Sequence, residues 1–308
     1  MTRNFRIATT VLGTITLIAT AVLGANSWAG ASAPHESPTV LSCHGSLLGS
    51  RLNKPIVGIA STSDQGGYWL VASDGGIFSY GDALFAGSTG AMTLNKPVVG
   101  MAATPDGNGY WLVAADGGIF SYGDAQFYGS TGGTTLNKPV VGMAATPDGK
   151  GYWLVASDGG IFSYGDAQFH GSTGSMTLNK PVVAMASTLN GGGYWLAAAD
   201  GGIFTFGNAT FLGSGPQQTP GVGDFNAFAA STDGAGYIMG DASRSFLLDF
   251  GDARYGGIGF NSADTSQLAG LTQPVASANY AYWDATAAGG VELNDPGPLA
   301  SSGSQTTC

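Results

Sequence analysis

Aspartates recur along this chain at a near-constant spacing, and they are its main candidates for chemistry. One series follows a glycine late in each repeated segment and consists of Asp82, Asp124, Asp166 and Asp252, with Asn208 in the fourth copy. A second series lies earlier in each segment and consists of Asp106 and Asp148, with Asp64 and Asp233 nearby in their own copies. Carboxylate oxygens are ligands that Ca²⁺ prefers, and concentrated negative charge attracts basic partners. One hypothesis is therefore a multivalent acidic face that holds Ca²⁺ or a basic partner.

The same aspartates also have a structural interpretation, which we favour. Asp accepts hydrogen bonds from nearby backbone N–H groups and tolerates the dihedral angles of tight turns. On this interpretation the chain needs no cofactor, and Ca²⁺ at Asp82, Asp124, Asp166 and Asp252 remains the alternative.

Signatures of an enzyme are scarce. The three histidines are His35, His44 and His170, and the last stands where other copies have Ala86 and Tyr128. We therefore interpret His170 as an outer-strand residue. The sequence contains no G-x-S-x-G elbow, P-loop, H-E-x-x-H or EF-hand motif. Hydrolysis would have to depend on carboxylates, and we predict no catalytic residue.

Four tryptophans at equivalent positions allow two interpretations. Trp69, Trp111, Trp153 and Trp195 could be exposed platforms for carbohydrate, or they could pack in the core. Neighbouring side chains of a strand point to opposite faces, yet all four residues of Tyr110–Val113 are apolar or aromatic. Such a strand is buried on both faces, which favours the core interpretation.

These residues belong to a repeat that sets the fold. The aromatic anchors Tyr68, Tyr110, Tyr152 and Tyr194 are 42 residues apart, and more divergent copies follow at Tyr237 and Tyr282. Turn signals divide each unit into four strand-sized runs. In the second unit these runs are Pro97–Thr104, Tyr110–Ala115, Ile119–Tyr122 and Gln126–Ser130.

Four-stranded units whose middle strands are buried on both faces are typical of β-propeller blades. Six units of 42 residues span Lys54 to Gln305. We predict an all-β, six-bladed β-propeller over residues 54–308, closed near the termini. A β-solenoid is the alternative, but an open solenoid needs polar caps that this sequence does not show.

Residues 32–53 form a predicted N-terminal segment that closes the ring. Ser46–Ser50 resembles the end of a repeat such as Phe85–Ser88, and it can supply an outer strand to the last blade. Cys43 and Cys308 flank this closure point and are the only cysteines, so we predict that they form a disulfide. Closing a loop of about 265 residues would stabilise the fold by about 5 kcal/mol on the loop-entropy account.

Residues 1–31 have the pattern of a cleaved signal peptide. Arg3 and Arg6 precede an apolar run over 7–25, and the small residues Ala31-Ser32-Ala33 follow. A retained membrane anchor is the alternative, because the apolar run nearly reaches spanning length. Cleavage leaves no stable membrane span and predicts a secreted, extracellular or cell-wall-associated protein.

The net charge of the chain argues against some classes of binding partner. The whole chain carries a formal net charge of −10. Without residues 1–31 it has 8 Lys and Arg against 20 Asp and Glu, a net charge of −12. Such an acidic protein does not suit phosphate backbones or anionic lipid, so we expect no nucleic acid partner.

The two rims of a propeller should differ in charge. Its connectivity places Lys54, Lys96, Lys138 and Lys180 on the same rim as Asp74, Asp116, Asp158 and Asp200. The two aspartate series then share the other rim, where Lys150 is the one evident counter-charge. We predict a strongly negative rim opposite a nearly balanced one.

The repeat resembles known propeller sequences. The stretch Thr104–Trp111, TPDGNGYW, resembles the SPDG-type turn and strand of YVTN and TolB-like propellers. The whole GYWLVASDGGIFSYGDA-type unit is similar to a 42-residue repeat of secreted actinobacterial proteins. The resemblance implies a β-propeller and export.

Taken together, the sequence predicts a monomeric, non-enzymatic binding or scaffold propeller that acts at the cell envelope or in the medium. Its partner would be an extracellular protein or a glycan. The alternative is a carboxylate-dependent extracellular hydrolase of glycans or esters. A close carboxylate pair in a central pocket, with one raised pKa, would favour that alternative.

Overall fold

The computed structural model describes most of the repeat region. The described residues are 44–47, 49–64, 66–219, 223–231, 234–241, 246–251, 268–272, 282–295 and 304–307. The chain divides into two units, Met1–Thr39 and Val40–Cys308, and every described residue belongs to the second. The predicted signal peptide, Cys43, Cys308, Asp233 and Asp252 lie outside the described residues.

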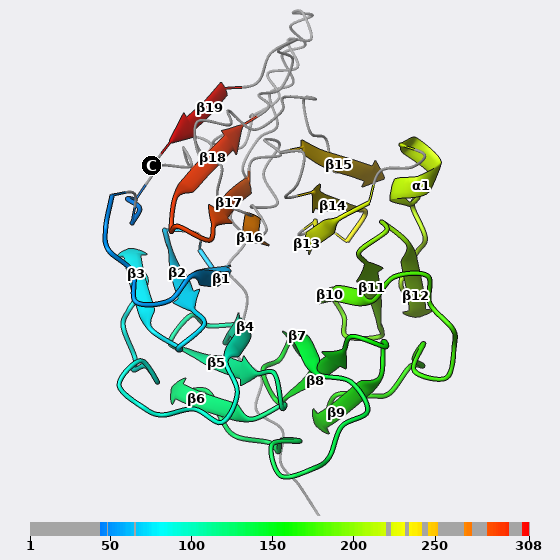
Figure 1. Cartoon of the computed structure of the whole chain (residues 1–308), viewed down its shortest axis with the longest axis horizontal. Coiled ribbons are helices and arrows are strands. Elements are labelled where there is room, and N and C mark those ends of the chain that lie inside the picture. Colours follow the sequence, from blue (N-terminus) through cyan, green and yellow to red (C-terminus); the bar gives the residue numbers. More distant parts are fainter. Residues whose placement is uncertain are drawn as a thin grey trace, which may run out of the picture. The chain divides into compact units, whose positions relative to one another are not determined.

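The second unit is an all-β, propeller-like repeat structure (Figure 1). Its first two sheets are β1 (Ile56–Ser61), β2 (Gly67–Ala72) and β3 (Ile77–Gly81), then β4 (Val98–Ala103), β5 (Gly109–Ala114) and β6 (Ile119–Gly123). The next two are β7 (Val140–Ala145), β8 (Gly151–Ala156) and β9 (Ile161–Gly165), then β10 (Val182–Ser187), β11 (Gly193–Ala198) and β12 (Ile203–Gly207).

A short helix, α1 (Gly215–Gln218), precedes a fifth three-stranded sheet of β13 (Phe225–Ala230), β14 (Gly236–Asp241) and β15 (Phe246–Gly251). A further sheet has four strands, β16 (Leu268–Thr272), β17 (Tyr282–Thr286), β18 (Val291–Asp295) and β19 (Ser304–Thr307). All these strand pairs are antiparallel. Within the described part of the chain, no helix is long and apolar enough to span a bilayer.

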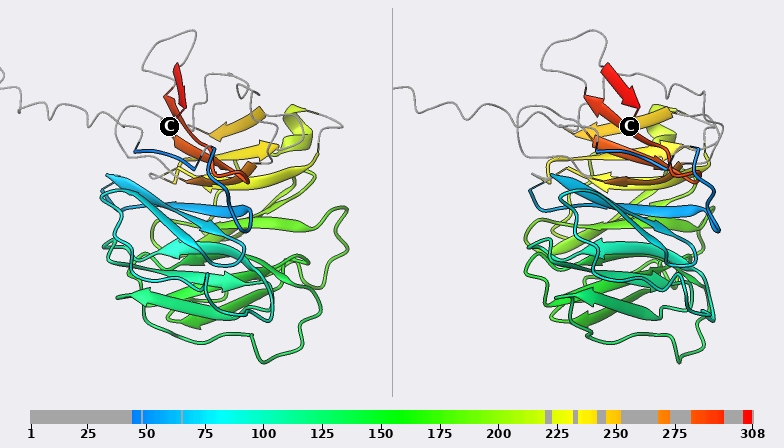
Figure 2. Two further views of the ribbon diagram at one scale, coloured as in Figure 1. Left: turned by 60° about the vertical axis from the view of Figure 1, so that its left-hand side comes forward. Right: turned by 90° about the vertical axis from the view of Figure 1, so that its left-hand side faces the viewer.

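Successive sheets pack through their first strands. β1, β4, β7, β10, β13 and β16 lie next to one another in that order, and β16 also lies beside β1. In Figure 1 these six strands face a common centre. Seen from the side, the strands run between two rims of loops (Figure 2).

The middle strands form the core, as their sequence predicts. Every residue of β2, β5, β8 and β11 is buried, although neighbouring side chains point to opposite faces. The hairpin after β5 needs glycine because Gly117 has φ of +75°. A Cβ there would lie 1.7 Å from Thr131 Oγ1, so the close approach also excludes a side chain.

The fourth strand that we predicted in each unit is absent from the first four sheets, whose outer segments the structure describes. In the second unit Gln126–Ser130 is irregular, because side chains and not a strand satisfy its backbone. Trp111 Nε1 donates to the carbonyl oxygen of Gln126 at 2.7 Å. Gly129 has φ of +139°, which is incompatible with a regular strand.

A tyrosine from the next blade completes this arrangement. Tyr152 OH donates to Gly129 O at 2.6 Å and accepts from the backbone N–H groups of Tyr128 and Gly129, both at 3.1 Å. The same tyrosine–glycine bond joins Tyr110 to Gly87, Tyr194 to Gly171 and Tyr237 to Gly213, at 2.6–2.7 Å. We call this recurring contact the tyrosine clamp.

The N-terminal segment contacts the last sheet in the same way that successive blades contact one another. Leu47 N donates to Gly289 O at 2.8 Å, and Ile56 N donates to Ala287 O at 3.0 Å. The equivalent bonds between the first two blades run from Thr89 N to Gly75 O and from Val98 N to Ser73 O. The strand that pairs with β18 is β19, and the described residues of 46–50 form no strand.

The tyrosine clamp predicts a measurable loss of stability for Tyr110→Phe. This variant keeps the buried ring but leaves Gly87 O and Ala86 N without the hydroxyl. We expect the free energy of unfolding in urea to fall by about 1–3 kcal/mol. Tyr122→Phe is the matched control, since no hydrogen bond of the Tyr122 hydroxyl exists among the described residues. Equal losses in the two variants would contradict a specific role for the clamp.

Candidate functional site

In each of the first four blades a buried threonine, Thr62, Thr104, Thr146 or Thr188, organises the turn that carries the Asp or Asn residues of the two series. Thr104 follows β4, and its backbone N–H donates to Gly109 O at 2.9 Å. Its Oγ1 accepts from Gly109 N at 2.9 Å and lies 2.9 Å from Asp106 Oδ1 and 3.0 Å from Asp124 Oδ1. The two aspartate series therefore meet on one rim, as predicted.

Asp106 and Asp124 are a close carboxylate pair with oppositely shifted pKa values. The side chain of Asn108, followed by its backbone N–H, lowers the pKa of Asp106 to about 2. Partial burial, followed by the hydrogen bond and charge of Asp106, raises the pKa of Asp124. Both side chains are exposed at the rim. The pair thus meets only part of the criterion for a hydrolase.

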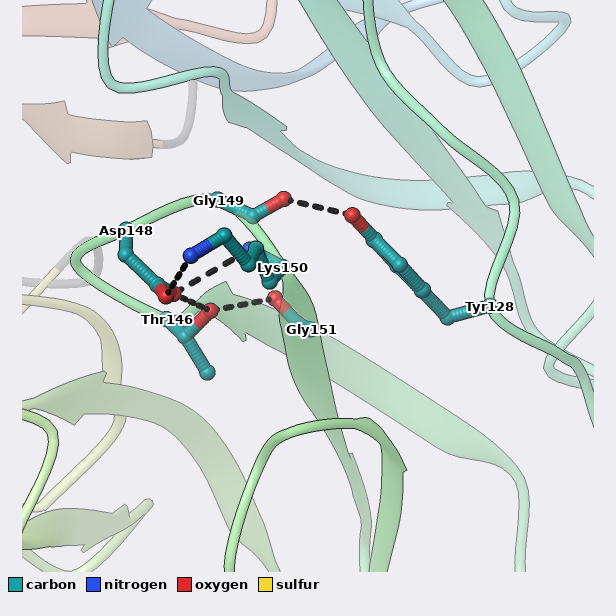
Figure 3. A network of polar contacts seen from close by, with 6 residues as sticks. All are labelled: Tyr128, Thr146, Asp148, Gly149, Lys150 and Gly151. Carbon is teal, nitrogen blue, oxygen red and sulfur yellow. Dashed lines mark hydrogen bonds and ion pairs between the residues drawn. The ribbon is translucent and has the colours of Figure 1, made fainter.

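The third blade replaces the asparagine with a lysine (Figure 3). Lys150 donates from its backbone to Asp148 Oδ1 at 3.2 Å, and its Nζ lies 3.1 Å from Asp148 Oδ2. The backbone bond and then the lysine side chain lower the pKa of Asp148 to about 2, while Asp148 raises the pKa of Lys150. Thr146 Oγ1 donates within this turn to Asp148 Oδ1 at 3.0 Å. Lys150 and Asp148 form the one ion pair within 4.0 Å in which both partners are described residues.

The turn of the first blade has the same arrangement of threonine and aspartates, with slightly longer hydrogen bonds. Thr62 Oγ1 donates to Asp82 Oδ1 at 3.2 Å, and Gly66 N donates to Asp64 Oδ1 at 3.1 Å. The bond from Gly66 is the main cause of a lowered pKa at Asp64. Asp166, the equivalent of Asp82 in the third blade, is exposed and close to Gly151, but no side-chain hydrogen bond joins it to Thr146.

The fourth blade keeps the same geometry without a carboxylate. Thr188 Oγ1 donates to Asn208 Oδ1 at 2.9 Å, and Asn208 Nδ2 donates to Asn190 Oδ1 at 2.7 Å. Gly192 N donates to Asn190 Oδ1 at 3.0 Å, as Gly66 N does to Asp64. Amides can therefore serve as the turn acceptors at both positions, and the fold does not require negative charge there.

The described residues offer few ligands for a metal. Within that part of the chain no three His, Cys, Asp or Glu side chains come together in a group that could hold an ion. The closest approach is a pair of carboxylates, whereas Ca²⁺ takes about six to eight oxygen ligands. Asp252 lies outside the described residues, so Ca²⁺ remains a prediction at that position.

The repeated tryptophans are core residues, which confirms the interpretation that we favoured. Trp69, Trp111, Trp153 and Trp195 are at most 1% exposed. Each indole N–H donates to a backbone carbonyl of its own outer segment at 2.7–2.9 Å. They present no exposed face to a sugar.

His170 has a structural role beyond that of a tolerated outer residue. Its Nε2 lies 3.2 Å from Gly191 O in the next blade, in the place where Tyr128 OH donates to Gly149 O at 3.0 Å. The ring also packs against Trp153 and Tyr194. His44 occupies the corresponding place beside Tyr68.

Sequence reasoning missed an exposed aromatic residue in each of the first four blades. Phe85, Phe127, Phe169 and Phe211 stand 42 residues apart and are 49–62% exposed. We call them the phenylalanine row. Each follows the Asp or Asn of the first series by three residues, so every outer corner joins a polar turn to an exposed ring. The periodic Ala-x-Phe pattern was the available signal.

The Lys-bearing rim is also as predicted. Pro97, next to Lys96, accepts from Ala115 N at 2.9 Å, and Asp116 Oδ1 accepts from Gly118 N at 3.0 Å. Lys96 and Asp116 line one hollow on this rim. Opposite charges are thus close together here, whereas the other rim is acidic.

No family model matches this chain, and no curated protein sequence does so either. Solved propellers resemble its fold. The β-propeller domain of Cps50 (Swd1) from Myceliophteria thermophila has a TM-score of 0.51 at 8% identity, covering 83% of this chain and 87% of that one. The WD40 repeats of RRP9 give a TM-score of 0.53 at 12% identity, covering 83% of this chain and 81% of the other. At these identities the likeness shows the propeller-like fold alone.

The lysine of the third blade predicts a specific change in titration. Lys150→Met should raise the pKa of Asp148 above its value of about 2, because the ammonium no longer stabilises the carboxylate. The rise should be incomplete, since the backbone N–H of residue 150 still donates. Carboxyl ¹³C shifts followed by NMR during an acid titration measure it. An unchanged pKa of Asp148 would show that the ion pair is absent in solution.

Proposed function

We propose that this chain is a secreted, non-enzymatic binding or scaffold propeller whose partner is a basic extracellular protein. The observation that carries the proposal is the repeated outer corner. In three successive blades an exposed Asp of the first series stands beside an exposed ring of the phenylalanine row. Neighbouring exposed apolar side chains are characteristic of interaction surfaces, and the acidic turns favour a cationic partner.

The acidic charge itself supports a role in binding. Asn190 and Asn208 build the fourth-blade turn without charge, so the fold does not need the carboxylates of the other blades. Partial burial, followed by the hydrogen bond and charge of Asp106, raises the pKa of Asp124, and the contribution of the Asp106 charge is an unfavourable interaction between the two ionised groups. A basic partner would offset this repulsion.

We further propose six blades closed into a ring. The bonds Leu47 N to Gly289 O and Ile56 N to Ala287 O support closure, because they repeat the contacts between successive blades. Tyr68 OH also donates to Gly45 O, as the other clamp tyrosines do to their glycines. A rigid ring would hold the outer corners at fixed spacing, which favours multivalent binding.

A carboxylate-dependent hydrolase is the second candidate. The opposed pKa shifts of Asp106 and Asp124 favour it, because such pairs divide the roles of acid and base. The hydrolase is the weaker proposal for two reasons. Both carboxylates are exposed, and the fourth blade has the amides Asn190 and Asn208 at the equivalent positions. Hydrolysis of glycan or ester substrates that is lost in Asp124→Asn would reverse this preference.

The binding proposal predicts different effects on the two rims. Asp82→Asn, Asp124→Asn and Asp166→Asn, combined, should weaken binding of a Lys- and Leu-rich peptide and reduce its salt dependence, measured by calorimetry at two salt concentrations. Folding should persist, since Asn208 already fills this position. The matched control combines Asp74→Asn, Asp116→Asn and Asp158→Asn, an equal charge change on the other rim. Equal weakening by both triple variants would show that net charge, and not the acidic rim, determines binding.

Ring closure predicts a disulfide between Cys43 and Cys308. Mass spectrometry of the non-reduced, secreted protein after proteolysis should find one linked pair of peptides that contain these two residues. Reduction should also lower the melting temperature, because the bond constrains the unfolded chain. Two free thiols in the secreted protein would contradict this part of the proposal.

A further inference from the structure

A hollow of about 210 Å³ opens on the rim opposite the acidic turns. One wall is residues 92–96, the connection that leads from the first blade into β4. The other wall is the hairpin between β5 and β6, with Asp116, Gly118 and Phe120. The hollow therefore lies where one blade is joined to the next, and it is separate from the phenylalanine row.

Its polar side chains retain hydrogen-bonding capacity. Asp116 uses Oδ1 to accept from Gly118 N at 3.0 Å, which leaves Oδ2 for another donor. Asn95 and Lys96 are exposed, and their side chains form no hydrogen bond or ion pair with other described residues. The walls thus offer an acceptor, a cationic donor and an amide that can do both.

Apolar groups line the same space. Phe120 and Leu94 are half-buried, and Met92 at the entrance is 57% exposed. Gly118 also lines the hollow, and a Cβ there would lie only 3.1 Å from Asp116 Oδ1. A ligand in the hollow would meet apolar carbon on some sides and hydrogen-bonding groups on others.

We propose that this hollow binds a single pyranose ring of a carbohydrate. A pyranose has an apolar face of C–H groups, and its adjacent hydroxyls each donate and accept. The Asp, Asn and Lys side chains supply both kinds of partner, and Lys96 and Asp116 balance in charge, which suits a neutral ligand. The volume is below the range of about 300–1,000 Å³ for drug-sized ligands, so one ring is the fitting size.

The repeat provides the same residue types in the neighbouring blades. Leu-Asn-Lys recurs at 52–54, 136–138 and 178–180, accompanied by Asp74 and Phe78, Asp158 and Phe162, and Asp200 and Phe204. A glycan with several rings could therefore engage more than one site. Multivalency would raise the overall affinity above that of a single exposed site.

NMR titration of the ¹⁵N-labelled secreted protein tests the proposal directly. The probes are the methyl glycosides of glucose, mannose and N-acetylglucosamine, with glycine as a zwitterion of opposite charges. At least one glycoside should shift the amide signals of Asn95 and Gly118 in a saturable manner. Lys96→Met and Asp116→Asn should each weaken that binding by about tenfold. Lys150→Met, a charge change on the other rim, should leave it unchanged.

Asp116→Asn is expected to fold, because the Asn amide oxygen can still accept from Gly118 N. Asn95→Ala is the second variant, since its side chain is exposed and makes no contact that the fold needs. The inference is overturned if no glycoside shifts these signals, if glycine alone shifts them, or if all three hollow variants bind as the unmodified protein does. The peptide assay on the acidic rim is independent, so either proposal can fail alone.

Discussion

The described blades of this protein are joined through tyrosine hydroxyls that project from the buried middle strands β2, β5, β8, β11 and β14. Tyr110, Tyr152, Tyr194 and Tyr237 are fully buried residues, yet each hydroxyl reaches the backbone of the preceding blade. Burial raises the pKa of every one of them, so they remain neutral donors at ordinary pH. Their bonds replace the ladder that a fourth strand would have supplied.

The tyrosine hydrogen bonds determine which positions of the outer segment can differ between blades. The outer segment must present a glycine carbonyl and a backbone N–H to the tyrosine. The residue just before that glycine differs in type between blades, although the rings of Tyr128 and His170 pack against the clamp tyrosine. Ala86, Tyr128 and His170 can therefore exchange with one another, and Asp can exchange with Asn in the turns. Residues of the turns and outer segments therefore differ from blade to blade while the tyrosine clamp is kept.

The sequence predicts the strands well because their residues are buried on both faces. The runs Pro97–Thr104, Tyr110–Ala115 and Ile119–Tyr122 correspond to β4, β5 and β6. The prediction of a fourth strand at Gln126–Ser130 is wrong. The backbone of this segment forms hydrogen bonds with the side chains of Trp111 and Tyr152, which are distant in sequence. Local propensity carries no information about such side-chain partners.

The candidate sites were predicted less completely. The placement of both aspartate series on one rim, opposite the lysine-bearing rim, could be predicted from the connectivity. Turns of the same kind lie at the same end of each sheet. The phenylalanine row was not predicted, because a Phe that recurs in an apolar repeat is typical of a buried core position. These rings are exposed because the outer segment that carries them is irregular and not a strand. The opposed pKa values of Asp106 and Asp124 depend on Asn108 and on burial, which spacing alone does not give.

Hydrogen exchange tests the central role of the tyrosine clamp most directly. The amides of Ala86, Tyr128, His170 and Leu212 lie outside every strand, but each donates to a clamp hydroxyl at 3.0–3.1 Å. They should exchange as slowly as strand amides, while the amides of Phe85 and Phe127 beside them exchange quickly. Fast exchange at all of these positions, with the strands still protected, would show that the clamps do not hold the blades together.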